Sequence, residues 1–152
     1  MNSLELKIPP MLMLSLIAAL MWSVSQLVPA AEFHLPARRL IALGFAVIGV
    51  GVAIAGVVSF RMAKTTVNPV KPQDASMLVV SGVYRFTRNP MYLGSLFLLI
   101  GWGAFLANFA AVVLVPSLVL YLNRFQIGPE ERALTSLFPE FSIYRAKVRR
   151  WL

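Results

Sequence analysis

Long uncharged apolar runs constrain this chain more than any other feature. Residues 8–28 and 40–60 contain no charged side chain, and each run supplies the roughly 20 residues that a helix needs to cross a bilayer core. Composition agrees, because 59% of the 152 residues are hydrophobic, 13% are charged and the mean hydropathy is +0.76. An ordinary soluble domain is less apolar. We therefore predict an all-α integral membrane protein.

The third apolar run, residues 89–123, is too long for one span. A straight helix of that length measures about 50 Å, against about 30 Å for the hydrocarbon core. Asn108 follows Gly101 and Gly103 near the middle of the run, so a tight turn is predicted near 107–109. We expect one domain, 1–152, with four spans at about 8–29, 39–60, 90–106 and 109–124. The last two spans form a short helical hairpin, the loop covers 61–88, and a C-terminal amphipathic segment covers 128–152.

Basic residues are divided unevenly between the two sides of this arrangement. Arg38 and Arg39 lie on one side, and twelve others lie on the opposite side: Lys7, Arg61, Lys64, Lys71, Arg85, Arg88, Arg124, Arg132, Arg145, Lys147, Arg149 and Arg150. The positive-inside rule then predicts a multi-pass protein of a bacterial inner membrane with both termini and loop 61–88 in the cytoplasm. Membrane lipids are the expected partners. No nucleic-acid partner is expected, because the charges follow topology and no base-reading motif accompanies them.

Residue content disfavours several kinds of site. The chain has no cysteine, so a thiolate metal site and a catalytic cysteine are excluded. Its one histidine, His34, falls in the predicted outer loop, away from the other candidates. Neither a catalytic dyad nor a metal site is therefore expected. The apolar runs also lack the ionisable residues that mark a transport pathway, which argues against a channel or transporter.

The most informative stretch is 81–94, where the third span begins. Asn89 followed by Pro90 is a good helix start, because asparagine can cap free backbone donors and proline at the first helical position loses no hydrogen bond. That explanation does not cover Tyr84, Arg88 and Tyr92, which flank the same helix end. Free N–H groups there favour an anionic ligand group, and arginine can bind a carboxylate through two hydrogen bonds.

A second cluster follows the fourth span. Glu130 and Glu131 come directly after Pro129, where acidic residues are also typical of an ordinary helix N-terminus. Apolar residues at spacings of three and four continue beyond them, interrupted near Pro139: Leu134, Leu137, Phe138, Phe141, Tyr144, Val148 and Trp151. The spacing predicts an amphipathic segment at the membrane surface. Hairpin geometry brings this cluster back beside the first.

Together these motifs resemble the isoprenylcysteine carboxyl methyltransferase and phospholipid methyltransferase superfamily. The resemblance covers about residues 61 to 152 and includes a bacterial-type stretch at 65–69. It rests on the order and separation of two motifs. These are Gly82-x-Tyr84-x-x-x-Arg88-Asn89-Pro90-x-Tyr92-x-Gly94 and Glu130-Glu131-x-x-Leu134-x-x-x-Phe138. Two departures stand out. Many relatives have histidine where Asn89 stands, and the tail is one residue shorter, with Pro139 in place of the usual glycine.

The resemblance implies an S-adenosylmethionine-dependent membrane methyltransferase. Its cofactor pocket would lie between the last hairpin and the C-terminal segment, lined by Tyr84, Arg88, Asn89, Pro90 and Tyr92 and closed by Glu130 and Glu131. Arg88 and Glu131 are the expected catalytic residues: Arg88 would hold the cofactor carboxylate, and Glu131 or Glu130 would accept from its amine or ribose. Tyr84 and Tyr92 would lie near the sulfonium.

The expected acceptor is a lipophilic small molecule or a lipid-linked group that enters sideways from the bilayer. A prenylcysteine carboxylate, a phospholipid amine, an apolar thiol and a quinone-like hydroxyl all fit this description. The main alternative is a non-catalytic small membrane protein that binds anionic lipid or a protein partner through the same basic residues. Homodimerisation through the second span is compatible with either interpretation.

Overall fold

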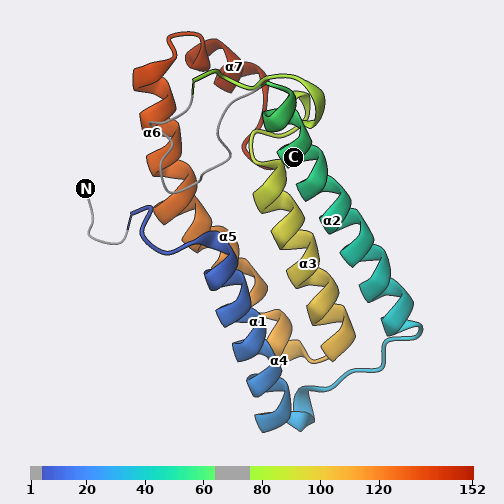
Figure 1. Cartoon of the computed structure of the whole chain (residues 1–152). Coiled ribbons are helices and arrows are strands. Elements are labelled where there is room, and N and C mark those ends of the chain that lie inside the picture. Colours follow the sequence, from blue (N-terminus) through green and yellow to red (C-terminus); the bar gives the residue numbers. More distant parts are fainter. Residues whose placement is uncertain (1–4, 64–75) are drawn as a thin grey trace.

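The computed structural model describes residues 5–63 and 76–152, and these residues form helices and no strands. The elements are α1 (Pro10–Leu27), η1 (Pro29–Ala31), α2 (Arg38–Met62), η3 (Gly82–Arg85), α3 (Pro90–Leu106), α4 (Phe109–Val112), α5 (Val115–Tyr121), the π-helical turn η4 (Leu122–Ile127), α6 (Gly128–Leu137) and α7 (Phe141–Lys147). Figure 1 shows α1, α2, α3 and the consecutive helices α4, α5 and α6 packed side by side, with α7 across one end. Lys64, Lys71 and the 65–69 motif lie outside the described residues.

Three helical stretches are long and apolar enough to cross a membrane: Pro10–Leu27, Arg38–Met62 and Phe109–Leu137. A fourth apolar helix, α3, has 17 residues. Many large apolar side chains on α1 and α2 are exposed, among them Leu16, Leu20, Leu43 and Val47, as expected of surfaces that face lipid. The predicted fold class, an all-helical membrane protein, is confirmed.

The connection between α3 and α4 is a tight turn at Ala107 and Asn108. Ala107 adopts the left-handed conformation (φ 48°), and its N–H donates to the Gly103 carbonyl. The Asn108 side chain caps the next helix by accepting from Ala111 N at 3.1 Å, and its amide donates to Val28 O at 2.9 Å. Asn108 therefore reverses the chain and also ties the hairpin tip to the end of α1.

The helix that begins at Phe109 continues beyond residue 124, the predicted end of the fourth span. The chain remains helical from Phe109 to Leu137, about 44 Å at 1.5 Å per residue, with no break between 124 and 128. Ile127 and Gly128 both have helical dihedral angles. A π-helical turn, Leu122–Ile127, precedes Pro129, whose missing N–H leaves the Phe125 carbonyl without its usual partner in the helix. Glu130 and Glu131 consequently lie within a continuing helix.

The N-terminal segment supplies the missing donor. The Leu6 N–H donates to the Phe125 carbonyl at 3.0 Å. Next to it, the Glu5 carboxylate accepts from Arg124 at 3.1 Å and from Arg132 at 2.7 Å. We call Glu5 and Leu6, together with these contacts, the N-terminal clasp. It connects the segment before α1 to the π-helical turn and to α6.

Glycines let α2 and α3 approach at backbone contact. A Cβ atom added at Gly94 would lie 2.5 Å from the Gly49 carbonyl oxygen, and one added at Gly49 would lie 2.7 Å from the Gly94 oxygen. Such contacts are typical of helix pairs in membranes, where small side chains permit close packing. The α2–α3 pair therefore provides a rigid support for the residues just before α3.

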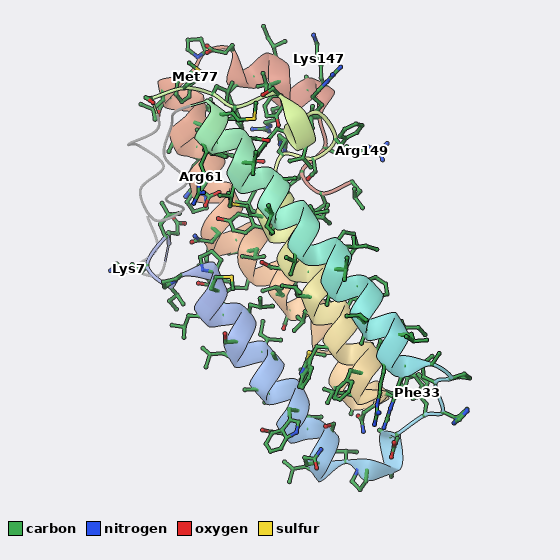
Figure 2. All side chains as sticks on the ribbon, turned by 45° about the vertical axis from the view of Figure 1, so that its right-hand side comes forward. Lys7, Phe33, Arg61, Met77, Lys147 and Arg149 are labelled. Atoms are coloured by element: carbon green, nitrogen blue, oxygen red, sulfur yellow. The ribbon has the colours of Figure 1, made fainter. Side chains whose placement is uncertain are left out.

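The two ends of the molecule differ in charge. Figure 2 shows Arg61, Lys147 and Arg149 toward one end and Phe33 at the other. We call the first the basic end. The start of α3, α6, α7 and the residues that follow α7 meet there (Figure 1).

Candidate functional site

The predicted site residues come together at the basic end. Arg88 Nη2 donates to Glu131 Oε1 at 2.8 Å, and the Tyr92 hydroxyl donates to Glu130 Oε1. These pairs join residues 43 and 38 positions apart. The two motifs of the sequence therefore form one site, between the start of α3 and α6.

Arg88 is held by the C-terminal end of α7 as well as by Glu131. Its Nη1 donates to the carbonyl oxygens of Arg145 and Val148, both at 2.8 Å, and its backbone N–H donates to Arg149 O at 3.0 Å. The last carbonyls of a helix lack partners within the helix, and a cation is favoured beside them. Arg88 therefore fixes the end of α7. Its buried Nε has no hydrogen-bond partner among the described residues.

Glu131 lies between two arginines. Arg150 Nη2 donates to Glu131 Oε2 at 2.6 Å, and Arg150 Nε donates to Oε1 at 3.2 Å. Glu131 is 7% exposed, so both ion pairs are screened less than surface pairs. We call Arg88, Glu131 and Arg150 the arginine triad. Its two guanidinium groups and one carboxylate leave a net positive charge.

The Asn89 side chain does not cap α3, in contrast to the structural explanation offered from sequence. No side-chain cap bond is present at that helix start. Instead Asn89 Nδ2 donates to the Arg150 carbonyl at 2.9 Å, and Thr87 Oγ1 donates to the same carbonyl at 3.2 Å. The amide is oriented by its bond to the backbone after α7, and its oxygen makes no cap bond to the free N–H groups of α3. Asn89 thus attaches residue 150 to the site.

Pro90 contributes to the site only through packing and through the start of α3. It begins α3, is buried and packs against Gly56 of α2, where an added Cβ would lie 3.1 Å from Pro90 Cγ. The family motif glycine, Gly94, is likewise explained by the close approach of α2 and α3. Neither residue presents a polar side chain to a ligand.

Two tyrosines, the buried Tyr84 and the half-buried Tyr144, lie close to Arg88. The Tyr84 ring packs edge-on against Phe60 at 5.3 Å, and the Tyr144 hydroxyl donates to the Tyr84 carbonyl at 2.7 Å. Burial raises the pKa of Tyr144 to about 12, and burial with the neighbouring Tyr144 and Glu130 raises the pKa of Tyr84. Both phenols therefore keep their protons near neutral pH, and the Tyr144 hydroxyl acts as a hydrogen-bond donor.

Sequence reasoning assigned no site role to Arg150, Asn123 or Thr87. The Asn123 Oδ1 atom accepts from Trp151 Nε1 at 3.2 Å and from Arg150 Nη1 at 3.4 Å. A signal was present, because Arg150 and Trp151 belong to the tail that resembles the family. Only the tertiary structure shows that this tail returns to Glu131.

The two cavities described lie at the opposite end of the molecule. One of about 360 Å³ is lined by residues that include Trp22, Trp102 and Asn108, and a second is lined by residues 32–40. His34 lines the second cavity. Neither cavity is lined by a residue of the predicted site.

Comparison with known proteins gives two matches. The family model described as phospholipid methyltransferase matches residues 37–140. An uncharacterized protein of Haemophilus influenzae is 44% identical over 63 residues, which are 41% of this chain and 100% of that protein. No solved structure is significantly similar. The matched range of the family model includes both motifs of the site and ends before Tyr144 and Arg150.

Proposed function

The chain belongs to the phospholipid methyltransferase family, and from this premise we propose that it transfers a methyl group from S-adenosylmethionine to a lipophilic acceptor at the cytoplasmic face of the membrane. The observation that carries the proposal is the meeting of the two motifs. Arg88 contacts Glu131 and Tyr92 contacts Glu130 at one end of a membrane-spanning bundle. Membership of the family makes this a membrane-associated methyltransferase.

The residues present fit this methyl donor. The amino-acid portion of S-adenosylmethionine carries a carboxylate and an ammonium group, and its sulfur is cationic. The arginine triad pairs two guanidinium groups with one carboxylate, and its excess positive charge suits the carboxylate of the donor. The Glu130 carboxyl group accepts from Tyr92 and has no salt bridge among the described residues, and its oxygens suit the ribose hydroxyls or the ammonium group.

Methyl transfer mainly requires the protein to align the methyl donor with the acceptor and to exclude water from the site. When bound, S-adenosylmethionine supplies an electrophilic methyl group for in-line displacement, and strong acid catalysis is not needed. Tyr92 and Tyr84 would present ring faces or hydroxyl groups near the sulfonium. Glu131 would keep the two arginines in position. Asn89 and Pro90 would fix the backbone conformation of the segment that carries these side chains.

The acceptor is proposed to enter from the bilayer. The site lies at the N-terminal end of α3, a 17-residue apolar helix, so an apolar substrate can reach it without leaving lipid. The raised pKa values exclude Tyr84 and Tyr144 as bases near neutral pH. An acceptor that is already ionised or unprotonated at neutral pH is therefore preferred, such as a prenylcysteine carboxylate. A phospholipid amine would need to lose a proton first.

Calorimetric binding of S-adenosylmethionine to the protein in nanodiscs tests the proposal. Glu130→Gln is expected to weaken binding by about 2 kcal/mol, the cost of losing a desolvated contact with the donor. Glu131→Ala is expected to weaken binding as well, because Arg88 and Arg150 lose the carboxylate that positions them. Glu32→Gln is the matched control, because Glu32 also pairs with an arginine, Arg38, but lies at the opposite end and is exposed. The Glu32→Gln variant is expected to bind S-adenosylmethionine as tightly as the wild type.

The acceptor classes are then compared by transfer of a labelled methyl group. Prenylcysteine analogues and phosphatidylethanolamine vesicles are offered separately to the wild-type protein and to Glu130→Gln. Transfer to one of them by the wild type, reduced in the variant, is the expected result. A folded wild-type protein that binds no S-adenosylmethionine at millimolar concentration would contradict the proposal and favour a non-catalytic lipid-binding protein.

A further inference from the structure

We propose that Arg150, beyond the range matched by the family model, is the residue that contacts the donor's carboxylate and makes the site specific for it, while Arg88 serves as a positioning residue. This inference rests on the proposed function. It divides between two arginines the role that the sequence motif gives to one.

Arg88 has little freedom to turn toward a ligand. Its guanidinium donates to two backbone carbonyls and to Glu131, and its own N–H is bonded to Arg149 O. Its side chain is only 10% exposed. Moving it would leave the end of α7 without hydrogen-bond partners and Glu131 with one arginine fewer. Such buried groups are costly to leave unpaired.

Arg150 combines a fixed backbone with an accessible head group. Its carbonyl is held by Asn89 and Thr87, so the main chain is anchored. Its side chain is 35% exposed and contacts side chains only: Glu131 and, at the longer distance of 3.4 Å, Asn123. A small rotation could exchange the Asn123 contact for a ligand oxygen while the bond to Glu131 persists.

The charge of the triad selects an anion at this position. Two guanidinium groups face one carboxylate that is 7% exposed. An additional anionic oxygen beside Arg150 would balance the charge, and arginine binds carboxylates through two parallel hydrogen bonds. The chemical class recognised is therefore the α-carboxylate of an amino-acid-bearing nucleoside.

Two ligands that differ only in this group test the inference. S-adenosylmethionine and its decarboxylated form are titrated calorimetrically into the wild-type protein, Arg150→Ala and Arg150→Lys in nanodiscs. Arg150→Ala is expected to weaken S-adenosylmethionine binding roughly 10- to 100-fold and to leave binding of the decarboxylated form unchanged. Arg150→Lys keeps the charge but loses the planar fork, so an intermediate loss is expected. Arg149→Ala, an exposed neighbour, is the control and should bind both ligands like the wild type.

The outcomes separate this inference from the proposed function. Equal loss for both ligands in Arg150→Ala and Arg150→Lys would assign Arg150 a purely structural role and overturn the inference. Equal affinity of the wild type for the two ligands would also overturn it, yet leave the methyl donor established. If the folded wild type binds neither ligand, both the proposed function and this inference fail.

Discussion

Single side chains at the basic end connect segments that are distant in sequence. Asn89 is the clearest case, because its position suits a helix cap and its amide instead holds the Arg150 carbonyl. Aspartate accepts hydrogen bonds as asparagine does and is an equally good cap, but it cannot donate. The two roles of this residue can therefore be separated by one substitution.

Asn89→Asp is expected to lower the free energy of unfolding by roughly 1–2 kcal/mol, because the bond to the Arg150 carbonyl is lost and a carboxylate then faces that oxygen. Thermal unfolding in detergent, compared with Asn89→Ala, measures the effect. If Asn89 acted as a helix cap, the aspartate variant would be as stable as the wild type and the alanine variant would be less stable, which would contradict this account.

At the scale of helices, the local signals in the sequence predicted some features and not others. The uncharged runs predicted the spans, because a bilayer leaves backbone groups no partner outside the helix. Asn108 predicted the hairpin turn because its cap is a local interaction. The continuous last helix was missed because Gly128-Pro129 is typical of a helix boundary. A tertiary contact accompanies the continuous helix: the Leu6 N–H donates to the Phe125 carbonyl, which Pro129 leaves without its usual partner.

The site was predictable to a similar extent. The motifs predicted that Arg88, Tyr92, Glu130 and Glu131 lie in one site, and these four side chains do meet at one end of the molecule. The pairing of Arg88 with Glu131 rather than with a ligand could not be predicted from spacing. The contribution of Arg150 depends on the path of the chain after α7, which no local pattern determines.

The α2–α3 contact gives a prediction at the same scale. Gly94→Ala places a methyl group 2.5 Å from the Gly49 oxygen and 2.9 Å from Ala53 Cβ, so the two helices must separate. Roughly 1–3 kcal/mol of destabilisation is expected from such overpacking. Thermal unfolding in detergent measures it. Gly51→Ala is the control on α2, because no atom lies within 4 Å of the added Cβ; a helical Gly→Ala change there should be neutral or mildly stabilising. Equal destabilisation by both variants would contradict this account of the contact.

For the whole molecule, the decisive property is which end faces the cytoplasm. Arg61, Lys147 and Arg149 lie toward one end and Phe33 at the other (Figure 2), and the positive-inside rule predicts that the basic end is cytoplasmic. The proposed function depends on this orientation, because S-adenosylmethionine is made in the cytoplasm.

The chain contains no cysteine, so single introduced thiols report orientation without background. His34→Cys and Ser142→Cys lie in exposed positions near opposite ends. In bacterial spheroplasts, a membrane-impermeant maleimide is expected to label His34→Cys directly and Ser142→Cys only after the membrane is permeabilised. The reverse pattern would put the site on the outer side and contradict the proposed orientation.

The N-terminal clasp also has a consequence for the order of events during synthesis. Glu5 and its partner Arg132 are 127 positions apart, so at about 5–20 residues per second the ribosome needs roughly 6–25 s to deliver the second after the first. Throughout that interval α1 occupies the bilayer without the clasp, held by its own apolar surface. The ion pair of Glu5 with Arg132 is therefore a late contact, which follows synthesis of residue 132.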